Sequence, residues 1–325
     1  MWKKKLVLVL VALSITIMLV KPGIGEEYPA KPIEVIEPFA AGASTDITCR
    51  IIAELAPKYL GQTLFVTNKP GASGSIGTAE VINAPPDGYK LLSAMSTYFI
   101  TTVRVQKIPF DPGDLIPILS FAEPRDILCV LSDSPWKSYE EVLKYARENP
   151  GKFRWGHVGR GAKPHVVVAG MFIKAGVKAT DMPYAGSAPL GPALLGGHVD
   201  AISGPFGPVN DYIKMGKVRV LAALTDHRYK TAPDAPSLVE LGYPELGMFA
   251  AKHGFYARKD TPKEILRKLL EAIGNVAKSE EFIKRVEAIG AEPRFDEPET
   301  ISEIIRKGGE VATPLLKELG LLAVK

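Results

Sequence analysis

The sequence is poor in the residue types that catalysis and metal binding use most. Its 325 residues include two cysteines and five histidines, the latter at positions 157, 165, 198, 227 and 253. The histidines form no HExxH motif and no paired metal-ligand spacing. A Gly-x-Ser-x-Gly nucleophile motif is missing too, because its nearest approach, Gly71–Ser75, lacks the final glycine. We therefore predict no catalytic residue, no metal ligand and no cofactor.

Cysteine is too scarce to build a disulfide framework. Cys49 and Cys129 each fall in a segment that we expect to be a regular element. They could pair in an oxidising compartment, but two cysteines in a chain of this size favour buried, small apolar residues. No cysteine follows the N-terminal apolar run, which excludes a bacterial lipoprotein anchor.

Charge of one sign and long hydrophobic runs are scarce as well. The net charge is +4, and Lys and Arg are scattered, so we predict no nucleic-acid partner. The run Leu6–Val20 has fifteen residues, fewer than the roughly 20 of a membrane span. With three lysines before it and small residues up to Gly25 after it, it predicts a secretory signal at residues 1–25. An uncleaved anchor is the alternative, and either way the body lies outside the cytoplasm.

After this segment, short β-rich runs alternate with helical patterns, which favours an α/β fold with largely parallel strands. In the first unit we predict strands at 33–39, 64–67 and 89–94 and helices at 46–60 and 75–83. Pro57 should kink or end the first helix.

A second α/β unit follows Pro117. We predict strands at 127–131, 153–157, 179–184, 199–203 and 218–225 and helices at 165–175, 188–195 and 209–215. Ser138 and Glu141 should form the capping box of a further helix, and Thr261 should cap one near the C-terminus.

Two such units and a helical tail predict a two-lobed body. We place lobe one at residues 28–120 plus 250–325 and lobe two at residues 121–249. Clefts between lobes are common sites for small ligands, and loops at the carboxyl ends of strands face them.

Two loops have the composition of an anion site. In "FAAGASTD", small residues let the main chain approach a ligand, Ser44 and Thr45 can donate hydrogen bonds, and Asp46 could cap its own helix. In "YAGSAPL", Gly186 turns the chain and Ser187 stands at the expected N-cap. Two facing helix starts could hold a small anion between the lobes; ordinary caps without a ligand are the alternative. "GHVGRGAKP" is neither a GxGxxG nor a Walker loop, so a phosphate ligand is disfavoured.

Eight ordered segments resemble one family. They are "YPAKPIEVIEPFAAGASTD" with Arg50, "LGQTLFVTNKPGASGSIGTAEV", "PPDGYKLL", "ENPGKFRWGHVGRGAKPH", "MPYAGSAPL", "LLGGHVDA", "GKVRVLAAL" and "APSLVELGYPELG". Together they cover nearly the whole mature chain and resemble the extracytoplasmic solute receptors of tripartite tricarboxylate transporters, also called Bug receptors.

The resemblance implies a type II periplasmic-binding-protein fold, in which two α/β lobes joined by a hinge close on a small organic carboxylate. It implies a periplasmic receptor, not an enzyme, that delivers its ligand to the permease subunits of a membrane transporter. We expect a monomer. A ligand-sensing partner of a membrane signalling protein and a hydrolase that uses the cleft stay open as alternatives.

The resemblance also implies which residues touch the ligand, partly through ordered water. On lobe one they are Phe39, Ala41, Gly42, Ser44, Thr45 and Asp46, and on lobe two Gly186, Ser187 and Ala188. Supporting positions are Ser73, Thr97, Gly159, Arg160 and His165.

Departures from the family pattern bear on specificity. Glu37 replaces an apolar residue, Ala43 the second of two glycines, Arg160 a small residue and Ala185 a basic or amide residue. We hypothesise that Arg160 pairs with a ligand carboxylate or with Glu37 across the closed cleft; a solvated surface arginine is the alternative. Glu37 either faces the cleft, where it would favour a ligand that carries an amine or amide, or points into lobe one.

Two further points stay open in the sequence. Gly308 and Gly309 interrupt the last helical pattern and leave the length of that helix undecided. The solute is equally undecided among dicarboxylates, tricarboxylates, aromatic acids, amino acids and nicotinate-like compounds.

Overall fold

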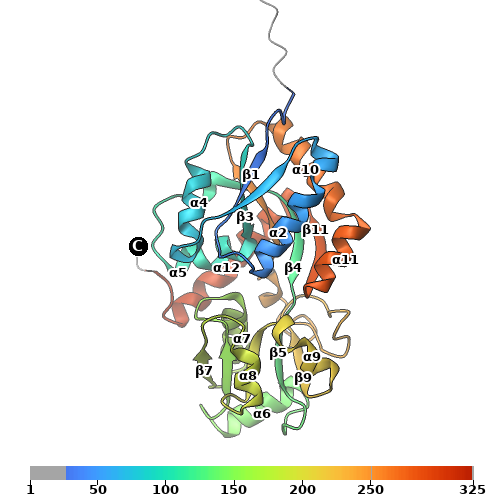
Figure 1. Ribbon diagram of the computed structural model, residues 1–325. Coiled ribbons are helices and arrows are strands. Elements are labelled where there is room, and N and C mark those ends of the chain that lie inside the picture. Colours follow the sequence, from blue (N-terminus) through green and yellow to red (C-terminus); the bar gives the residue numbers. More distant parts are fainter. Residues whose placement is uncertain (1–26, 250, 324–325) are drawn as a thin grey trace, which may run out of the picture.

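The computed structural model describes residues 27–249 and 251–323, which form two α/β lobes, one above the other in Figure 1. The predicted signal segment, and with it the alternative of an uncleaved anchor, lies outside the described residues. No helix within the described ranges has the length and hydropathy needed to cross a membrane.

Lobe one is built on a six-stranded sheet in the order β11-β4-β10-β3-β1-β2. Its strands are β1 (Ile33–Glu37), β2 (Leu64–Asn68), β3 (Lys90–Met95), β4 (Leu115–Pro124), β10 (His253–Arg258) and β11 (Ala291–Asp296). The strand β1 pairs in parallel with β2 and β3, whereas β10 and β11 run antiparallel to β4.

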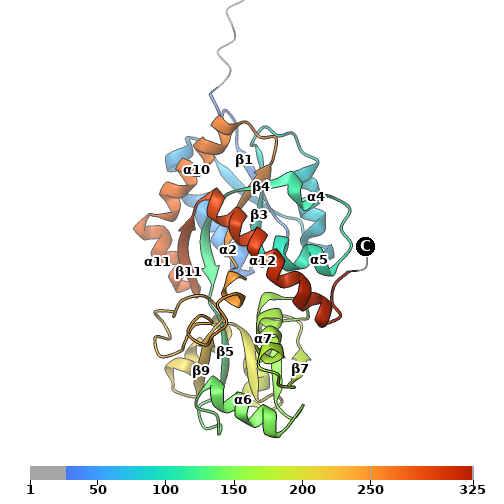
Figure 2. The ribbon, with the colours of Figure 1, turned by 180° about the vertical axis from the view of Figure 1, so that it is seen from behind.

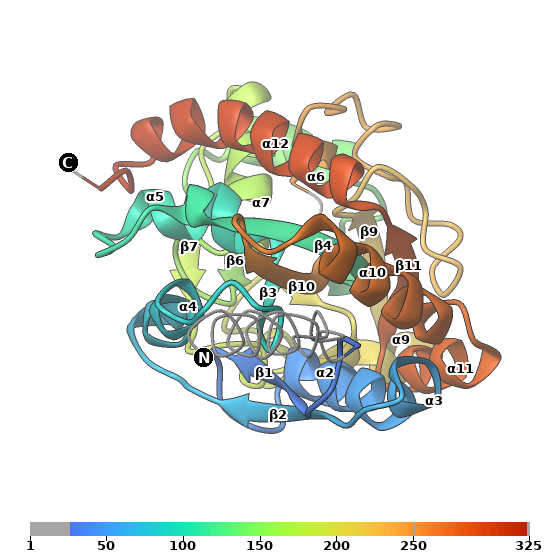
Figure 3. The ribbon, with the colours of Figure 1, turned by 90° about the horizontal axis from the view of Figure 1, so that it is seen from above.

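Helices cover both faces of this sheet, as Figure 3 shows from above. One face packs on α2 (Ser44–Leu55), α3 (Pro57–Leu60), α10 (Lys263–Ala277) and α11 (Glu280–Ala288). The other packs on α4 (Ser75–Ile82), the π-helical turn η2 (Tyr98–Thr102) and α12 (Pro298–Glu318). Short elements complete the lobe: η1 (Ala72–Gly74), α5 (Val103–Val105) and η3 (Pro112–Asp114).

Lobe two is built on a five-stranded sheet in the order β7-β6-β8-β5-β9. Its strands are β5 (Asp126–Leu131), β6 (Arg154–His157), β7 (Thr180–Pro183), β8 (Ala201–Pro205) and β9 (Val218–Ala223). Its helices are α6 (Tyr139–Glu148), α7 (Lys163–Lys174), α8 (Leu190–Leu195), α9 (Asn210–Lys214), η4 (Gly207–Val209) and η5 (Leu246–Met248). The strand β6 is parallel to β7 and β8, and β5 is antiparallel to β8 and β9.

The prediction of largely parallel strands was wrong for the strands nearest the connection. The strand β4 runs out of the first sheet and continues after Arg125 as β5 of the second. Because the chain crosses without a βα unit, these strands take antiparallel partners. The change of sheet falls at Arg125, later than the predicted limit at Ser120, and Phe121 packs on Phe255 and Phe282 in the core of lobe one.

The helix α12 runs past Gly308 and Gly309 without a break and crosses in front of the junction of the lobes in Figure 2. A Cβ atom on Gly308 would lie 2.7 Å from Ile100 Cδ1, and one on Gly309 would meet the Arg104 guanidinium. The glycines therefore let the helix approach η2 closely instead of ending it. Near its end, Leu315 and Leu316 join the core of lobe two.

Local signals have mixed outcomes. Pro57 does end α2, because Ala56 closes α2 and Pro57 begins α3. Ser138 caps α6 by accepting the N–H of Glu141, whose carboxylate accepts the N–H of Lys137.

Two other expectations had different outcomes. The prediction of a Thr261 cap was wrong, because the N-cap of α10 is Pro262, whose ring makes no capping bond. Cys49 and Cys129 are buried, unpaired and packed in different lobes, as small apolar residues would be.

Candidate functional site

The first anion loop lies where β1 passes to α2. The strand β1 ends at Glu37 because Pro38 has no N–H for a further ladder bond. The chain turns through Gly42, which has a left-handed φ of +85°, and α2 begins at Ser44. Among the described residues no side chain caps this helix, and its N-cap position is held by Ala43. The first N–H groups of α2 are thus available to an anion.

Asp46 does not cap its own helix. Its carboxylate accepts the N–H of Gly42 at 2.8 Å, the Asn68 amide at 2.9 Å and the Arg50 guanidinium at 3.1 Å. Burial by itself raises the pKa of Asp46, but the bonds from Arg50, Gly42 and Asn68 outweigh it and hold that pKa below its usual range. At 2% exposed, Asp46 ties the loop to α2 and β2.

Glu37 points into lobe one, which is the second of the two orientations that strand alternation allows. Its Oε1 atom accepts the hydroxyl of Thr45 at 3.0 Å, and its Oε2 atom accepts the hydroxyl of Ser93 at 2.6 Å. The Ser93 oxygen also lies 2.8 Å from Nε2 of His253. Burial raises the pKa of Glu37 to about 7, against the lowering effect of the bonds from Ser93 and Thr45.

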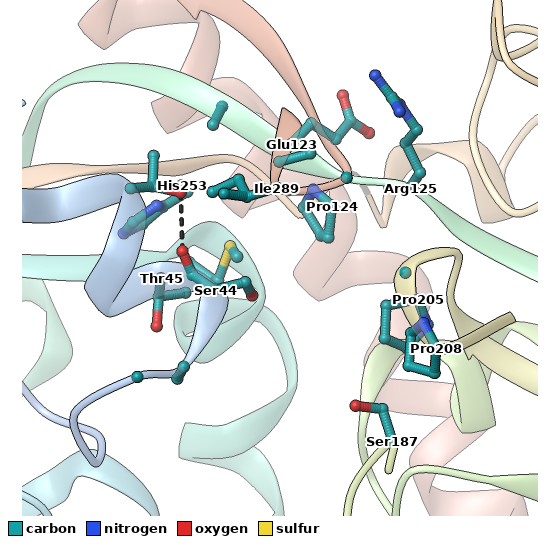
Figure 4. A pocket seen from close by; sticks show the side chains of 18 residues that line it. Ser44, Thr45, Glu123, Pro124, Arg125, Ser187, Pro205, Pro208, His253 and Ile289 are labelled. Atoms are coloured by element: carbon teal, nitrogen blue, oxygen red, sulfur yellow. Dashed lines mark hydrogen bonds between the residues drawn. The ribbon is translucent and has the colours of Figure 1, made fainter. Parts of the chain in front are cut away.

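A cavity of about 280 Å³ opens between the lobes, and Thr45 and His253 are among the residues that line it. Figure 4 shows Ser44 and Thr45 on one side and Ser187, Pro205 and Pro208 opposite. The segment Glu123–Arg125, where the chain changes sheets, lines the same space. The cavity therefore brings together four of the predicted ligand contacts, Gly42, Ser44, Thr45 and Ser187, and Ala43, one of the departures from the family pattern.

The second anion loop differs from the prediction. The helix α8 begins at Leu190 instead of Ala188, and its N-cap is Pro189, not Ser187. Ser187 instead begins a turn in which its carbonyl accepts the N–H of Leu190 at 3.2 Å, and Gly186 has a φ of +89°. Because the residue before a proline is disfavoured in a helix, Ala188 cannot easily start one. The cavity thus faces one helix start and one turn.

Other predicted residues gather along a second edge of lobe one. The rings of Phe39 and Tyr98 both lie within 3.4 Å of the place that a Cβ on Gly74 would take. This contact joins the loop that holds Ala41 to the loop that holds Ser73 and to η2, whose N-cap is Thr97. Ser73 has a φ of +51°.

The glycine-rich loop of lobe two, residues 156–164, reaches the same edge of lobe one. A Cβ on Gly161 would lie 3.5 Å from the Val105 side chain of α5. Gln106, which follows Val105, donates from its side-chain amide to the Ala72 carbonyl and to the Ser75 hydroxyl. Gly159 and the Ser73 loop therefore belong to neighbouring parts of the surface between the lobes.

Arg160 pairs with neither Glu37 nor a cleft group. It lies 2.9 Å from Asp181, which also lies 3.4 Å from His157 Nε2 and 3.8 Å from His165 Nε2. Burial lowers the pKa of His165 to about 4, so this ring is neutral, and burial also lowers the pKa of His157. Arg160 and His165 line a separate hollow beside α7.

The atoms of His157, His165 and Asp181 lie close enough to surround a metal ion, within 4.8 Å of one another. The backbone argues against that use. Gly159 and Gly161 donate their N–H groups to Nδ1 of His157 and His165 respectively, which leaves the ring proton on Nε2, the atom that faces Asp181. A metal ion would need that Nε2 unprotonated, so the cluster serves better as an anchor for the glycine loop.

A family profile described as "Tripartite tricarboxylate transporter family receptor" matches residues 48–321. The chain belongs to this family. It is 30% identical to Protein BugT of Bordetella pertussis over 283 residues, 86% of each chain.

Solved structures agree with this receptor assignment and with the type II periplasmic-binding-protein fold. A TctC solute-binding protein from Polaromonas, solved without ligand, is 32% identical with a TM-score of 0.81, over 90% of this chain and 99% of that one. An R. palustris protein with adipate is 26% identical, with a TM-score of 0.75 and coverages of 92% and 100%. MatC of Rhodopseudomonas palustris with bound malate is 25% identical, with a TM-score of 0.68 and coverages of 88% and 100%.

Several residues at the receptor's cavity escaped sequence reasoning, among them Glu123, Arg125, His253 and Gly290. They come from strands and turns at the connection, which carry no glycine-rich or capping signature. The available signal was "EPRD", residues 123–126, where a long apolar strand gives way to charged residues between two sheets.

Proposed function

We propose that this receptor captures a small organic carboxylate between its lobes outside the cytoplasm and delivers it, unaltered, to the permease subunits of a tripartite tricarboxylate-type membrane transporter. The observation that carries the proposal is the start of α2, whose N–H groups no side chain caps and whose residues Ser44 and Thr45 line the cavity opposite Ser187. Helix N-termini attract carboxylates through their N–H groups and the helix dipole.

Two relatives support the choice of ligand class. The structures solved with adipate and with malate both extend over most of this chain. Dicarboxylates are therefore the first ligands to test. No catalytic role is needed for capture, because backbone N–H groups bind an anion without changing it.

We assign ligand contact first to Gly42, Ser44, Thr45 and Ser187, which already line the cavity. Closure of the lobes about the segment near Arg125 would bring the remaining candidates toward the same ligand: Phe39, Ala41, Ser73, Thr97, Gly159, Gly186 and Ala188. Arg160 would first have to leave Asp181. We further propose that the receptor acts in the periplasm as a monomer.

A thermal-shift panel tests the function. Adipate, malate, citrate, benzoate and glutamate would be added to the purified protein, followed by calorimetry on every acid that raises Tm. We expect micromolar affinity, about −8 kcal/mol, and recovery of the unchanged acid after denaturation. No shift with any of these acids, or recovery of a converted product, would contradict the proposal.

A charge-matched pair of variants localises the site. Ala43→Glu places a carboxylate at the cavity wall, where it should repel the acid and weaken binding at least about tenfold. Ser302→Glu adds the same charge on the exposed face of α12, outside the cavity, and should leave affinity unchanged. Equal losses in both variants would contradict the assigned site.

A further inference from the structure

Glu37 is separated from the cavity by a single hydroxyl group. Thr45 lines the cavity, and its Oγ1 atom also lies 3.0 Å from Glu37 Oε1. Behind Glu37, Ser93 bonds the second carboxylate oxygen and contacts His253, which lines the cavity from another side. Glu37 itself is 1% exposed, so it touches no ligand and can act on one only through the Thr45 hydroxyl and through its own charge.

The ionised form of Glu37 fixes the direction of these hydrogen bonds. A carboxylate only accepts, so Thr45 and Ser93 must both point their single hydroxyl protons at Glu37. His253 then donates its Nε2 proton to Ser93. Thr45 is left with lone pairs toward the cavity, where a ligand carboxylate, itself an acceptor, finds no donor in that hydroxyl.

The protonated form reverses one bond. A proton on Oε1 of Glu37 donates to the Thr45 oxygen, which frees the Thr45 proton to point into the cavity and donate to a carboxylate. The bond from Ser93 to Oε2 stays as it is, because Ser93 still accepts from His253. Protonation also removes a buried negative charge from beneath the site.

We propose that this receptor takes up a proton on Glu37 when it binds a carboxylate. The Thr45 hydroxyl donates to the ligand only when Glu37 is protonated, and this makes binding depend on the protonation of Glu37. This inference rests on the proposed function, and it adds Glu37 as a residue that makes affinity depend on pH. It acts through Thr45 and touches no ligand itself.

The other titratable groups around Glu37 keep a fixed protonation state near neutral pH. On α2, Asp46 is ionised and paired with Arg50, and burial raises the pKa of the Cys49 thiol far above neutrality. On β10, burial lowers the pKa of His253 to about 3 and keeps that ring neutral. Glu37, with a pKa of about 7, is the member of this cluster that changes charge near neutral pH.

Calorimetry with adipate and with malate, from about pH 6 to about pH 9, tests the inference. For the wild-type receptor we expect affinity to weaken up to about tenfold per pH unit above pH 7, with close to one proton taken up per acid bound. Buffers of different ionisation enthalpy measure that proton directly. Glu37→Gln, whose amide donates permanently to Thr45, should bind at the low-pH affinity throughout and take up no proton.

Glu34→Gln is the matched control. Glu34 lies on the same strand, but it pairs with Lys90 at 2.9 Å away from the cavity, so its variant should keep the wild-type pH profile. Thr45→Val removes the hydroxyl that links Glu37 to the ligand and serves as the second variant if Glu37→Gln does not fold. This variant should bind the acid weakly at every pH, and its affinity should not change as Glu37 titrates.

The outcomes separate the two proposals. Binding of either acid with a pH profile that Glu37→Gln and Thr45→Val leave intact would overturn the proton coupling while the receptor function stands. A wild-type receptor that binds none of the five acids of the thermal-shift panel at any pH would overturn the carboxylate function and the coupling with it.

Discussion

Two buried carboxylates, Asp46 and Glu37, flank the start of α2 at nearly equal depth, 2% and 1% exposed. Asp46 accepts from a backbone N–H, an amide and a guanidinium, and its pKa falls below the usual range. Glu37 accepts from two hydroxyls, and its pKa rises to about 7. Burial raises the pKa of both groups, and only at Asp46 do the bonds from its donors outweigh that effect.

The difference lies in the kind of donor. A backbone N–H, an amide N–H and a guanidinium can only donate, so they fix an anion in place. A hydroxyl can donate or accept, so it satisfies both the ionised and the protonated acid. Asp46 is consequently a fixed anchor for the anion loop, whereas Glu37 is free to titrate beneath it.

The strongest test of the anchor is Asp46→Asn. The amide cannot accept from all three donors, and Arg50 loses its carboxylate partner, so we expect a loss on the order of 3–4 kcal/mol of unfolding free energy. Urea denaturation followed by circular dichroism measures it. Asp234→Asn, on an exposed turn of lobe two, is the control and should change stability little; a similar loss there would refute the comparison.

Stability against pH tests the titrating partner. The folded pKa of Glu37, about 7, exceeds its ordinary value of 4.5, so its contribution is fully present below pH 4.5 and is lost as pH rises through 7. Relative to Glu37→Gln, the wild type should therefore lose on the order of 2–3 kcal/mol over this window. Parallel stability curves for the two proteins would mean that the pKa of Glu37 is the same in the folded and unfolded states, which would contradict its raised value.

Asn68→Ala sharpens the comparison by removing one fixed donor from Asp46. The amide of Asn68 donates to Asp46 and to the Phe39 carbonyl, and its oxygen accepts from Arg50 at 2.7 Å. We expect a loss on the order of 1–2 kcal/mol, since the site is only partly buried. Hydrogen exchange should localise the added opening to residues 39–46, and exchange that increases elsewhere instead would contradict this assignment.

The smallest effect should follow Arg50→Gln. The Arg50 side chain is 48% exposed, so its pair with Asp46 should contribute less than about 1 kcal/mol at neutral pH and less still at high salt. The pKa of Asp46 is depressed, so its stabilisation is lost as pH falls through the folded value. Acid unfolding of Arg50→Gln should therefore begin at higher pH than that of the wild type. An unchanged pH of acid unfolding would show that Gly42 and Asn68 are enough to keep the pKa of Asp46 depressed.

Much of the local structure followed from the sequence. The anion loop, the break at Pro57 and the cap at Ser138 depend on neighbouring residues and backbone conformation alone. Four ligand candidates meet at the cavity because they occupy loops that open toward the cleft in this fold. Their contact with a ligand stays a prediction.

What the sequence missed depends on contacts between distant residues. In the sequence, Gly308 and Gly309 interrupt the last helical pattern, yet in the structure they let α12 pack against Ile100 of η2 and Arg104 of α5. The sequence predicted Ser187 as a helix N-cap, but α8 begins at Leu190 and its N-cap is Pro189. The sequence offered Glu37 as one partner for Arg160, but the structure pairs Arg160 with Asp181, twenty-one positions along the chain, and its contact with a ligand stays a prediction.

By itself, the sequence determined the family, the two-lobed α/β architecture and the loops that open on the cleft, because these follow from motifs and periodicities that span a few neighbouring residues. Only the tertiary structure decided that Glu37 is buried under Thr45 and that Asp46 is locked by Asn68 and Arg50. The charge of a buried carboxyl depends on which donors the fold brings to it, and Ser93 and Asn68 reach Glu37 and Asp46 from the strands β3 and β2.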